Sequence, residues 1–443
     1  MTPAVWLPLH GVGGARDLPV PAGLAVAAGV AALAASFVVL ALAWRTPRYD
    51  ARTAGRPLPA GAARVLDSPV TRWVLRAVGL AFAGYVAWPL FAGPDVVTNP
   101  VFGVFYVLLW VGIVPASLLI GPAYRLLSPV RTVHRLVVRA AGGHPSRGLL
   151  TYPARLGLWP AALGLLAFVW QELVDPSSTL LDSVRLWLVL YAAIMLVGAA
   201  VFGDTWFARA DPFEVWSELV GRLAPIGRRA DGRLVLRSPL AGLEGTPVRA
   251  GTVAVLAVMF GSTAFDSFKD QLRWVDLLQA QPLPQTLAST LALVGFCLVV
   301  LVTFTAAAAA TRVGSSYPRR ELPRRLVHAV VPIVVGYLVA HYLTYFVEQG
   351  QTTLVQLSDP MVDGSDYLGT GGWTIGYWLS SHPSLLATVK VLAVVVGHVT
   401  GAVAAHDRAL TLLPRGHRVV GQLAMVVLMM AYTGGGLWLL FAS

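Results

Sequence analysis

The segment from Leu326 to Gln351 constrains the fold most, because it is apolar and long enough to cross a lipid bilayer. About 20 residues at the rise of an α-helix span the hydrocarbon layer. The segment nevertheless carries Tyr337, His341, Tyr345 and Glu348, and steps of four, four and three residues place them on one helical face. A polar stripe is costly in lipid, so we expect it to face protein or a water-filled cavity.

Further apolar segments of similar length recur along the chain. The sequence is 56% hydrophobic and 12% charged, whereas an average soluble domain has about 25% charged residues. We therefore predict an all-α fold, a single integral membrane domain over residues 1–443 that contacts the lipid bilayer. The ten expected transmembrane spans are residues 22–44, 73–93, 101–121, 157–174, 186–203, 250–268, 286–311, 326–348, 385–405 and 419–441.

Basic residues are divided unevenly between the two sets of connecting loops. The loops after spans 1, 3, 5, 7 and 9 hold 27 of the 33 lysines and arginines, and the loops on the other side hold four. Because basic loops stay in the cytoplasm, we predict that both termini lie outside it, with the protein in the inner (plasma) membrane. Topology thus explains the net charge of +11, and we expect no nucleic-acid partner.

Two segments 83 residues apart, Ser128–Ala141 and Asp211–Ala224, resemble each other. Each opens with Ser-Pro or Asp-Pro, a typical helix start, and the same offset carries spans 2 and 3 onto spans 4 and 5. We predict a tandem repeat of a helical hairpin, with each copy ending in an amphipathic helix on the cytoplasmic surface. The alternative for these helices is a site for a cytoplasmic protein partner. The second lies in a cytoplasmic loop, residues 205–249, where an Asp-Gly turn in an alternating run predicts a small hairpin.

Acidic residues recur near the outer ends of spans 4, 6 and 8, at Glu172, Asp266 and Glu348. A carboxylate at a helix C-terminus opposes the helix dipole, so these residues are not caps. They either reach the water at the outer headgroups or form a shared outward-facing polar pocket.

Span 9 places further titratable residues opposite the stripe of span 8. At the rise of an α-helix, Lys390 reaches a height similar to that of His341, and His398 lies in a deeper layer. His406 and Asp407 follow at the inner end. A histidine, a lysine and three acids can bind an anion or a metal, or relay protons. For His341 the alternative is a buried neutral imidazole bonded to a neighbour.

Two outer segments have the composition of covers for such a pocket. The Gly-rich stretch His10–Pro21 would bring His10 to the acids if it forms an ordered turn, and a disordered tail is the alternative. The long loop 350–383 carries Trp373, Tyr377 and Trp378, which form either an interfacial aromatic belt or part of a lid.

Four stretches, HGVGGARDLPVP, GSTAFDSF, AHYLTYFVEQGQ and GHVTGAVAAHDRAL, resemble a bacterial and archaeal family of polytopic membrane proteins labelled fenitrothion hydrolase. The resemblance covers nearly the whole chain in order and implies a common architecture. The family label implies hydrolysis of an organophosphate triester.

Two functions fit these residues. The first is a metal-assisted hydrolase, in which a divalent metal activates water and polarises a phosphoryl or acyl oxygen of a small-molecule substrate. Its predicted metal ligands are His341, Asp266, Glu348 and His10, and its predicted catalytic residues are His341, Glu348, Asp266 and Lys390. The second is a secondary transporter or channel-like protein that moves an ion or small solute past His341, Lys390 and His398. A structural subunit that binds another membrane protein is a third alternative.

Overall fold

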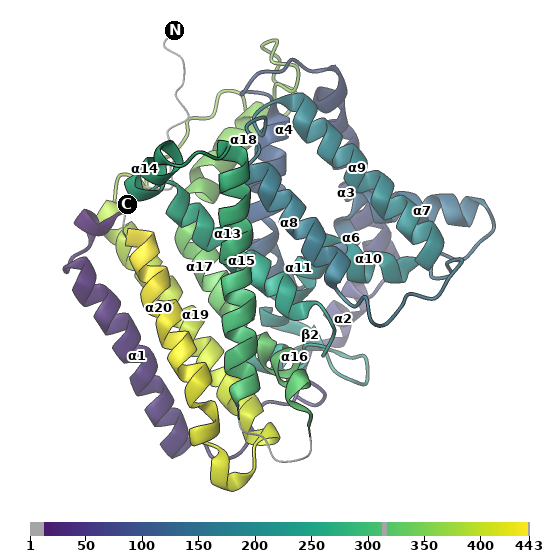
Figure 1. The fold of residues 1–443 in the computed structure, drawn as a ribbon. Coiled ribbons are helices and arrows are strands. Elements are labelled where there is room, and N and C mark those ends of the chain that lie inside the picture. Colours follow the sequence, from purple (N-terminus) through teal and green to yellow (C-terminus); the bar gives the residue numbers. More distant parts are fainter. Residues whose placement is uncertain (1–12, 312–316, 442–443) are drawn as a thin grey trace.

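The computed structural model describes residues 13–311 and 317–441, which are almost entirely helical (Figure 1). The α-helices are α1 (Ala22–Ala43), α2 (Ala60–Leu66), α3 (Pro69–Ala92), α4 (Pro100–Phe102), α5 (Ile113–Ile120), α6 (Tyr124–Leu127), α7 (Pro129–Ala140), α8 (Trp159–Leu173), α9 (Leu181–Phe202), α10 (Asp204–Ala210), α11 (Pro212–Val220), α12 (Pro239–Glu244), α13 (Thr252–Lys269), α14 (Leu272–Ala280), α15 (Gln285–Ala310), α16 (Leu322–Leu326), α17 (Val331–Thr344), α18 (Gly350–Gln356), α19 (Pro383–Leu412) and α20 (Leu423–Phe441). Two segments are π-helical, η3 (Gly103–Val111) and η7 (Tyr345–Gln349). The 3-10 turns are η2 (Ala15–Asp17), η4 (Gly221–Leu223), η5 (Arg319–Glu321), η6 (Val327–Val330), η8 (Arg415–His417) and η9 (Val420–Gln422).

Seven helical stretches of the described chain are long and apolar enough to cross a membrane, which confirms a polytopic helical membrane protein. They are residues 22–43, 69–92, 181–202, 285–310, 319–356, 383–412 and 420–441. The pair 100–111 and 113–120, bent by 41°, makes an eighth if it is one span. Two expected spans, 157–174 and 250–268, correspond to α8 and α13, which have 15 and 18 residues and lie outside this set. The count of ten therefore stays a prediction.

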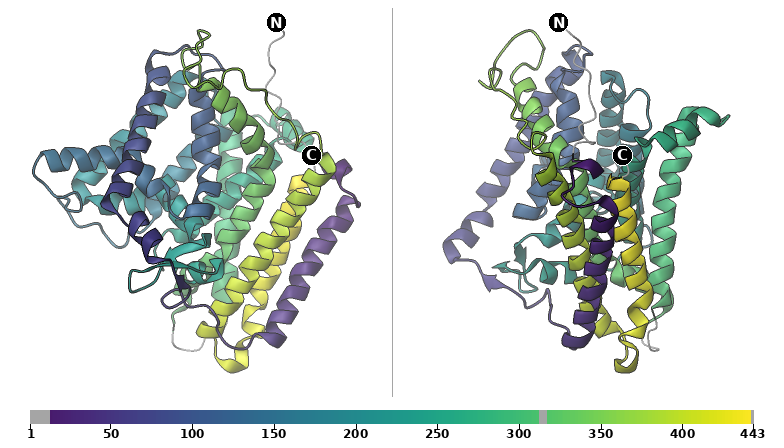
Figure 2. Two further views of the ribbon diagram at one scale, coloured as in Figure 1. Left: turned by 180° about the vertical axis from the view of Figure 1, so that it is seen from behind. Right: turned by 90° about the vertical axis from the view of Figure 1, so that its left-hand side faces the viewer.

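The helices form two groups that lie side by side (Figures 1 and 2). One group contains α1, α13, α15, α17, α19 and α20, and the other contains α3 to α11. The groups meet where α8 packs against α13, η3 against η7, and α11 against α17. Helix α1 begins and α20 ends at the same end of the molecule, as an even number of crossings requires (Figure 1).

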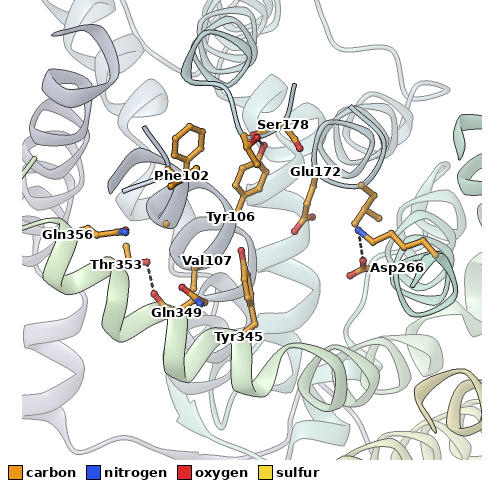
Figure 3. Close-up of a pocket in the computed structure, with 15 residues that line it drawn as sticks. Phe102, Tyr106, Val107, Glu172, Ser178, Asp266, Tyr345, Gln349, Thr353 and Gln356 are labelled. Atoms are coloured by element: carbon orange, nitrogen blue, oxygen red, sulfur yellow. Dashed lines mark hydrogen bonds and ion pairs between the residues drawn. The ribbon is translucent and has the colours of Figure 1, made fainter. Parts of the chain in front are cut away.

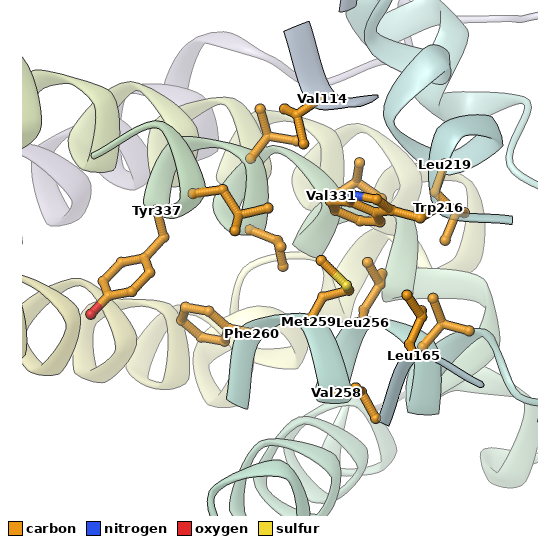
Figure 4. Close-up of a cluster of buried hydrophobic side chains, with 14 of the residues drawn as sticks. Val114, Leu165, Trp216, Leu219, Leu256, Val258, Met259, Phe260, Val331 and Tyr337 are labelled. Carbon is orange, nitrogen blue, oxygen red and sulfur yellow. The ribbon is translucent and has the colours of Figure 1, made fainter. Parts of the chain in front are cut away.

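A single large hydrophobic core joins the two groups (Figure 4). Its centre is Trp216 of α11, the largest fully buried side chain of the described residues. Around it lie apolar side chains from three other helices, which include Leu165 of α8, Met259 of α13 and Val331 of α17.

Helices α7 and α11 begin at the predicted prolines, after Ser128 and Asp211, whose side chains accept backbone N–H groups of the first turn. The prediction of two surface helices is wrong for α11, which is buried on all sides between α5, α8 and α17. Its polar positions have buried partners. Glu214 accepts two hydrogen bonds, of 2.6 and 2.5 Å, from Arg131, and the hydroxyl of Ser217 lies 2.8 Å from that of Ser117.

The helices after each hairpin pack reciprocally. Helix α7, from the first half of the predicted repeat, packs against α9 of the second half, and α11 of the second half packs against α5 of the first. Arg131 and Glu214, which form an ion pair, are themselves separated by the repeat offset of 83 residues. The second helix of each hairpin ends at a glycine of positive φ, Gly121 or Gly203, a conformation that side chains rarely adopt.

The predicted hairpin is present and belongs to a three-stranded sheet. Strands β2 (Ile226–Arg228) and β3 (Leu234–Leu236) pair antiparallel around a turn at Gly232, where φ is +83°. The third strand, β1 (Arg56–Pro57), has no counterpart in the sequence prediction; it comes from the loop after α1 and pairs with the other edge of β3.

Helices α17 and α19 are in close contact along glycines. A Cβ on Gly397 would lie 2.5 Å from the carbonyl oxygen of Pro332, and one on Gly336 would lie 2.4 Å from that of Ala393. Gly401, four residues after Gly397, is equally close to Ala329. This spacing of small residues lets two membrane helices approach backbone to backbone.

Candidate functional site

A cavity of about 190 Å³ lies where the two helix groups meet (Figure 3). At about 30 Å³ per water molecule, it has room for roughly six waters or one small solute. Its walls come from η3, η7, α8, α13, α18 and the loops before α4 and α9. The lining residues are Val97, Phe102, Gly103, Tyr106, Val107, Glu172, Leu173, Ser178, Thr179, Asp266, Lys269, Tyr345, Gln349, Thr353 and Gln356.

Both π-helical segments face this cavity. Tyr106 and Val107 come from η3, and Tyr345 and Gln349 come from η7, which packs against η3. Segments of π-helix are rare and occur often at functional sites. Gly103 brings the walls together, because a Cβ there would lie 2.2 Å from the Thr353 hydroxyl of α18.

Asp266 is the centre of a hydrogen-bond network in the cavity wall. Its Oδ2 atom accepts a hydrogen bond of 2.6 Å from the Tyr342 hydroxyl and lies 2.8 Å from Nε2 of His341. Its Oδ1 atom lies 3.0 Å from the ammonium group of Lys269, one helical turn away on α13. Asp266 is 2% exposed. A buried carboxylate needs such donors, since burial of an unpaired charge is very costly.

The network continues through His341 to a second layer. Nδ1 of His341 lies 3.2 Å from the hydroxyl of Ser267, and that hydroxyl lies 2.9 Å from the hydroxyl of Tyr337. The Ser267 hydroxyl also donates a 3.1 Å hydrogen bond to the carbonyl of Thr263, so its oxygen is shared between Thr263, Tyr337 and His341. These contacts fix the position of His341 behind Asp266 rather than in the cavity.

Glu172 approaches the cavity from α8 (Figure 3). Its Oε2 atom is out of contact with solvent and has no hydrogen-bond partner among the described residues. With Glu172 and Asp266 ionised and Lys269 protonated, the cavity wall carries one net negative charge. An unpartnered buried carboxylate oxygen needs either a proton or a cation.

The predicted polar stripe faces protein, as expected. Tyr337, His341 and Glu348 are each at most 5% exposed, and Tyr345 lines the cavity. The structure brings His341, Asp266, Glu172 and Tyr345 to one region. Glu348 does not join them: its carboxylate instead accepts 3.0 and 2.8 Å hydrogen bonds from the backbone N–H and hydroxyl of Ser380, which lies in the loop between α18 and α19.

The predicted residues of span 9 lie outside the cavity wall. Lys390 is buried on α19, which packs against α1, α17 and η2 rather than α13. His398 donates from Nδ1 to the carbonyl of Val394, 2.8 Å away, within its own helix. His406 and Asp407 anchor the chain that follows α1. Asp407 accepts hydrogen bonds from the Trp44 indole and from the backbone N–H groups of Arg48 and Tyr49, and Nε2 of His406 lies 3.0 Å from the Trp44 carbonyl.

The predicted metal-ligand set is not assembled in the described residues. No three His, Cys, Asp or Glu side chains of residues 13–311 and 317–441 lie close enough together to hold a metal ion. His341 and Asp266 are in contact, but Glu348 is turned away to Ser380. His10, the fourth predicted ligand, lies outside the described residues.

Several residues of the site were absent from the sequence prediction. Lys269 stands three residues after Asp266 on the same helix, a spacing that signals an ion pair. Tyr342 is one residue away from the predicted stripe, and Tyr106 and Gln349 enter through the π-helical segments. The regular 3.6-residue period used to read the stripe does not hold across η7, so helical spacing could not place Gln349.

In comparisons with known proteins, no family model, no curated protein and no solved structure matches the chain.

Proposed function

We propose that this protein binds a small cation in the cavity between the two helix groups and carries it across the membrane as a secondary transporter. The observation that carries the proposal is the buried Oε2 atom of Glu172, which has no partner among the described residues and lies at the wall of a 190 Å³ cavity. Ionisable residues at membrane depth typically mark ion or substrate pathways.

The charges of the cavity favour a cation of charge +1. Lys269 compensates one of the two carboxylates, Asp266, and leaves Glu172 to be compensated by the solute or by a proton. The hydroxyls of Tyr106 and Tyr345 and the amide of Gln349 can provide neutral oxygen ligands around the same solute. Two π-helical segments, a feature that occurs often at functional sites, supply facing walls of the cavity.

The orientation of the chain supports access from outside. The cavity is lined by loops after spans 2 and 4 and by the C-terminal end of α13, on the side opposite to the arginine-rich loops. With ten spans and both termini outside the cytoplasm, as we propose, this end faces outward.

We also propose that residues 69–224 arose by tandem duplication of a hairpin, the two copies being related by a rotation about the membrane normal. Equivalent helix starts at Pro129 and Pro212, the reciprocal packing of α7 and α11, and the ion pair between equivalent positions Arg131 and Glu214 support this proposal. A rotation axis that passes near this ion pair would bring equivalent residues into contact.

Hydrolysis of a phosphotriester, which the family resemblance implies, is the competing proposal. It needs an activated water, and of the four predicted catalytic residues only Asp266 lines the cavity, with His341 directly behind it. The two nitrogens of His341 face Asp266 and Ser267, and His341 does not itself line the cavity. The two proposals are separated by a direct measurement of turnover.

The test uses purified full-length protein in liposomes. We expect uptake of radiolabelled Na⁺ or methylammonium above that of protein-free liposomes, and at least tenfold slower uptake by Glu172→Gln, which keeps the shape and removes the charge. Glu321→Gln, at a surface ion pair with Arg325, is the matched control and should behave as the wild type. Absence of uptake of both cations would overturn the proposal. Cleavage of a chromogenic aryl phosphotriester that is lost in Glu172→Gln would favour the hydrolase.

A further inference from the structure

Two arginines that the cavity does not use lie against one tryptophan at the edge of the second helix group. The guanidinium carbon of Arg76, on α3, is 5.1 Å from the centre of the Trp73 ring, and that of Arg139, on α7, is 5.2 Å from it. The two guanidinium carbons are therefore at most about 10 Å apart. Within the described residues, neither guanidinium has a hydrogen bond or an ion pair, and the carboxylate that acts on Arg76 from a greater distance, that of Asp204, already pairs with Arg131 and Arg135.

The position of Arg76 makes this lack of a partner costly. It is the eighth residue of α3, a helix apolar and long enough to cross a membrane, of which only 11% is buried inside the protein. At the rise of an α-helix, Arg76 stands roughly 10 Å beyond the start of α3. Val74 and Val78 are exposed, as for a surface that faces lipid, but they lie across the helix from Arg76, whose own side of α3 packs against α6 and α7. An arginine at this depth extends its side chain to the headgroup layer, where its charge can be satisfied.

The second repeat copy shows how the same position is satisfied within the chain. The 83-residue offset of the proposed duplication relates Arg139 to Arg222, which forms an ion pair with Glu218 one turn earlier. The residue equivalent to Glu218 is Arg135, which pairs with Asp204 and so offers Arg139 no negative charge. The residue equivalent to Arg76 is Trp159, which is uncharged. The first copy therefore presents two guanidiniums on one surface that form no ion pair with the described residues.

We propose that Arg76 and Arg139, with Trp73 between them, bind the phosphate of an anionic phospholipid such as phosphatidylglycerol. A guanidinium forms paired hydrogen bonds with phosphate oxygens, and a tryptophan ring lies favourably at the level of the headgroups. The site is at the end of α3 that leads to the arginine-rich loops, where basic pockets bind anionic headgroups. An anionic lipid compensates the guanidiniums, whereas a zwitterionic lipid brings its own cation. This inference is independent of the solute that the cavity binds.

The test compares ligands on delipidated full-length protein in detergent. Native mass spectrometry counts bound phosphatidylglycerol, and thermal unfolding measures the stabilisation that binding confers. We expect phosphatidylglycerol to raise the melting temperature of the wild type, and neither phosphatidylcholine nor inorganic phosphate at the same concentration to do so. Arg76→Gln/Arg139→Gln should bind one phosphatidylglycerol fewer and lose most of the rise in melting temperature. Arg139→Gln alone should weaken phosphatidylglycerol binding at least threefold. Because Arg139 is exposed, this single variant still tests the site if the double variant does not fold.

Arg222→Gln is the matched control, because it removes the equivalent arginine of the second copy, whose charge Glu218 already compensates. It should bind the same number of phosphatidylglycerol molecules as the wild type. Equal binding by wild type and both Arg139 variants would overturn the proposed site. Equal stabilisation by inorganic phosphate would overturn the assignment to a lipid, since a free anion would then satisfy the arginines.

Discussion

Asp266 is the residue on which most of the cavity wall depends. It accepts from Tyr342, contacts His341 and pairs with Lys269, so one carboxylate positions side chains from two helices. Asp266→Asn should lower the stability of the protein by about 2–4 kcal/mol, because it leaves Lys269 without its counter-charge. The loss should stay below that of a fully buried pair, since Lys269 is 27% exposed.

The melting temperature in detergent measures this effect. Asp276→Asn, at an exposed position of α14, is the control and should melt with the wild type. If Asp266→Asn and Asp276→Asn have the same melting temperature, the hydrogen bonds and the ion pair of Asp266 contribute nothing to stability.

At the scale of single residues, the sequence predicts which polar side chains are buried better than it predicts their hydrogen-bond partners. The stripe from Tyr337 to Glu348 was expected to face protein because lipid cannot satisfy polar groups, and it does. The partner of Glu348 was out of reach, since Ser380 is brought to it by the fold of a long loop. Lys390 was placed in the pocket by depth alone, and depth along a helix does not say which neighbour a side chain faces.

At the scale of elements, the contact between α17 and α19 depends on glycine. Gly397→Ala should destabilise the protein by about 1–3 kcal/mol, because the new methyl group would lie 2.5 Å from the carbonyl oxygen of Pro332 and would force two packed helices apart. Gly295→Ala is the matched control. Gly295 is also helical, on α15, and a Cβ there meets nothing within 4 Å. That variant should keep or slightly raise the melting temperature. Equal melting of the two variants would contradict a tight contact at Gly397.

The loop between α18 and α19 should loosen in acid. Asp366 accepts hydrogen bonds from the hydroxyl of Ser358 and from the backbone of Gly371, and these bonds, led by that of Ser358, lower the pKa of the Asp366 carboxyl. A lowered pKa in the folded loop stabilises it fully above the ordinary aspartate value of about 3.9, and the stabilisation is lost as the pH falls below that value.

Hydrogen exchange of residues 358–371, corrected for the pH dependence of chemical exchange, measures this change between pH 6 and pH 3. The wild-type loop should lose protection toward pH 3. Asp366→Asn should exchange fast at both pH values, because its amide cannot supply the charge. A wild-type loop equally protected at pH 6 and pH 3 would show that Asp366 does not hold it.

Helices and strands with a regular spacing of apolar residues were predictable from the sequence, and segments that depart from this spacing were not. Apolar length identified the long helices, and the Asp-Gly turn identified the hairpin of β2 and β3. The burial of α11 was missed because its polar residues look solvated until their partners Arg131 and Ser117 are known. Neither π-helical segment has a signature in hydropathy, although together they form two walls of the cavity.

At the scale of the whole molecule, the cavity exists only because two helix groups meet. Its walls come from segments that begin near Val97 and end near Gln356, and the contacts between α8 and α13 and between η3 and η7 bring them together. Long-range packing of this kind is set by the summed shape of many side chains, which no local pattern encodes. The sequence predicted that a polar pocket would form near Asp266, but it could not predict its walls.

The orientation of the whole molecule rests on the division of 27 basic residues against four, and single cysteines can test it. Cys297, the one cysteine of the sequence, is 7% exposed, and Cys297→Ala removes it so that any labelling comes from an introduced cysteine. In intact cells, an impermeant maleimide should label Thr2→Cys and Ser443→Cys. It should label Ser238→Cys, at the exposed start of α12, only after permeabilisation. This pattern follows from an even number of spans with the arginine-rich loops in the cytoplasm. The reverse pattern would place the cavity on the cytoplasmic side, and labelling of only one terminus in intact cells would require an odd number of spans.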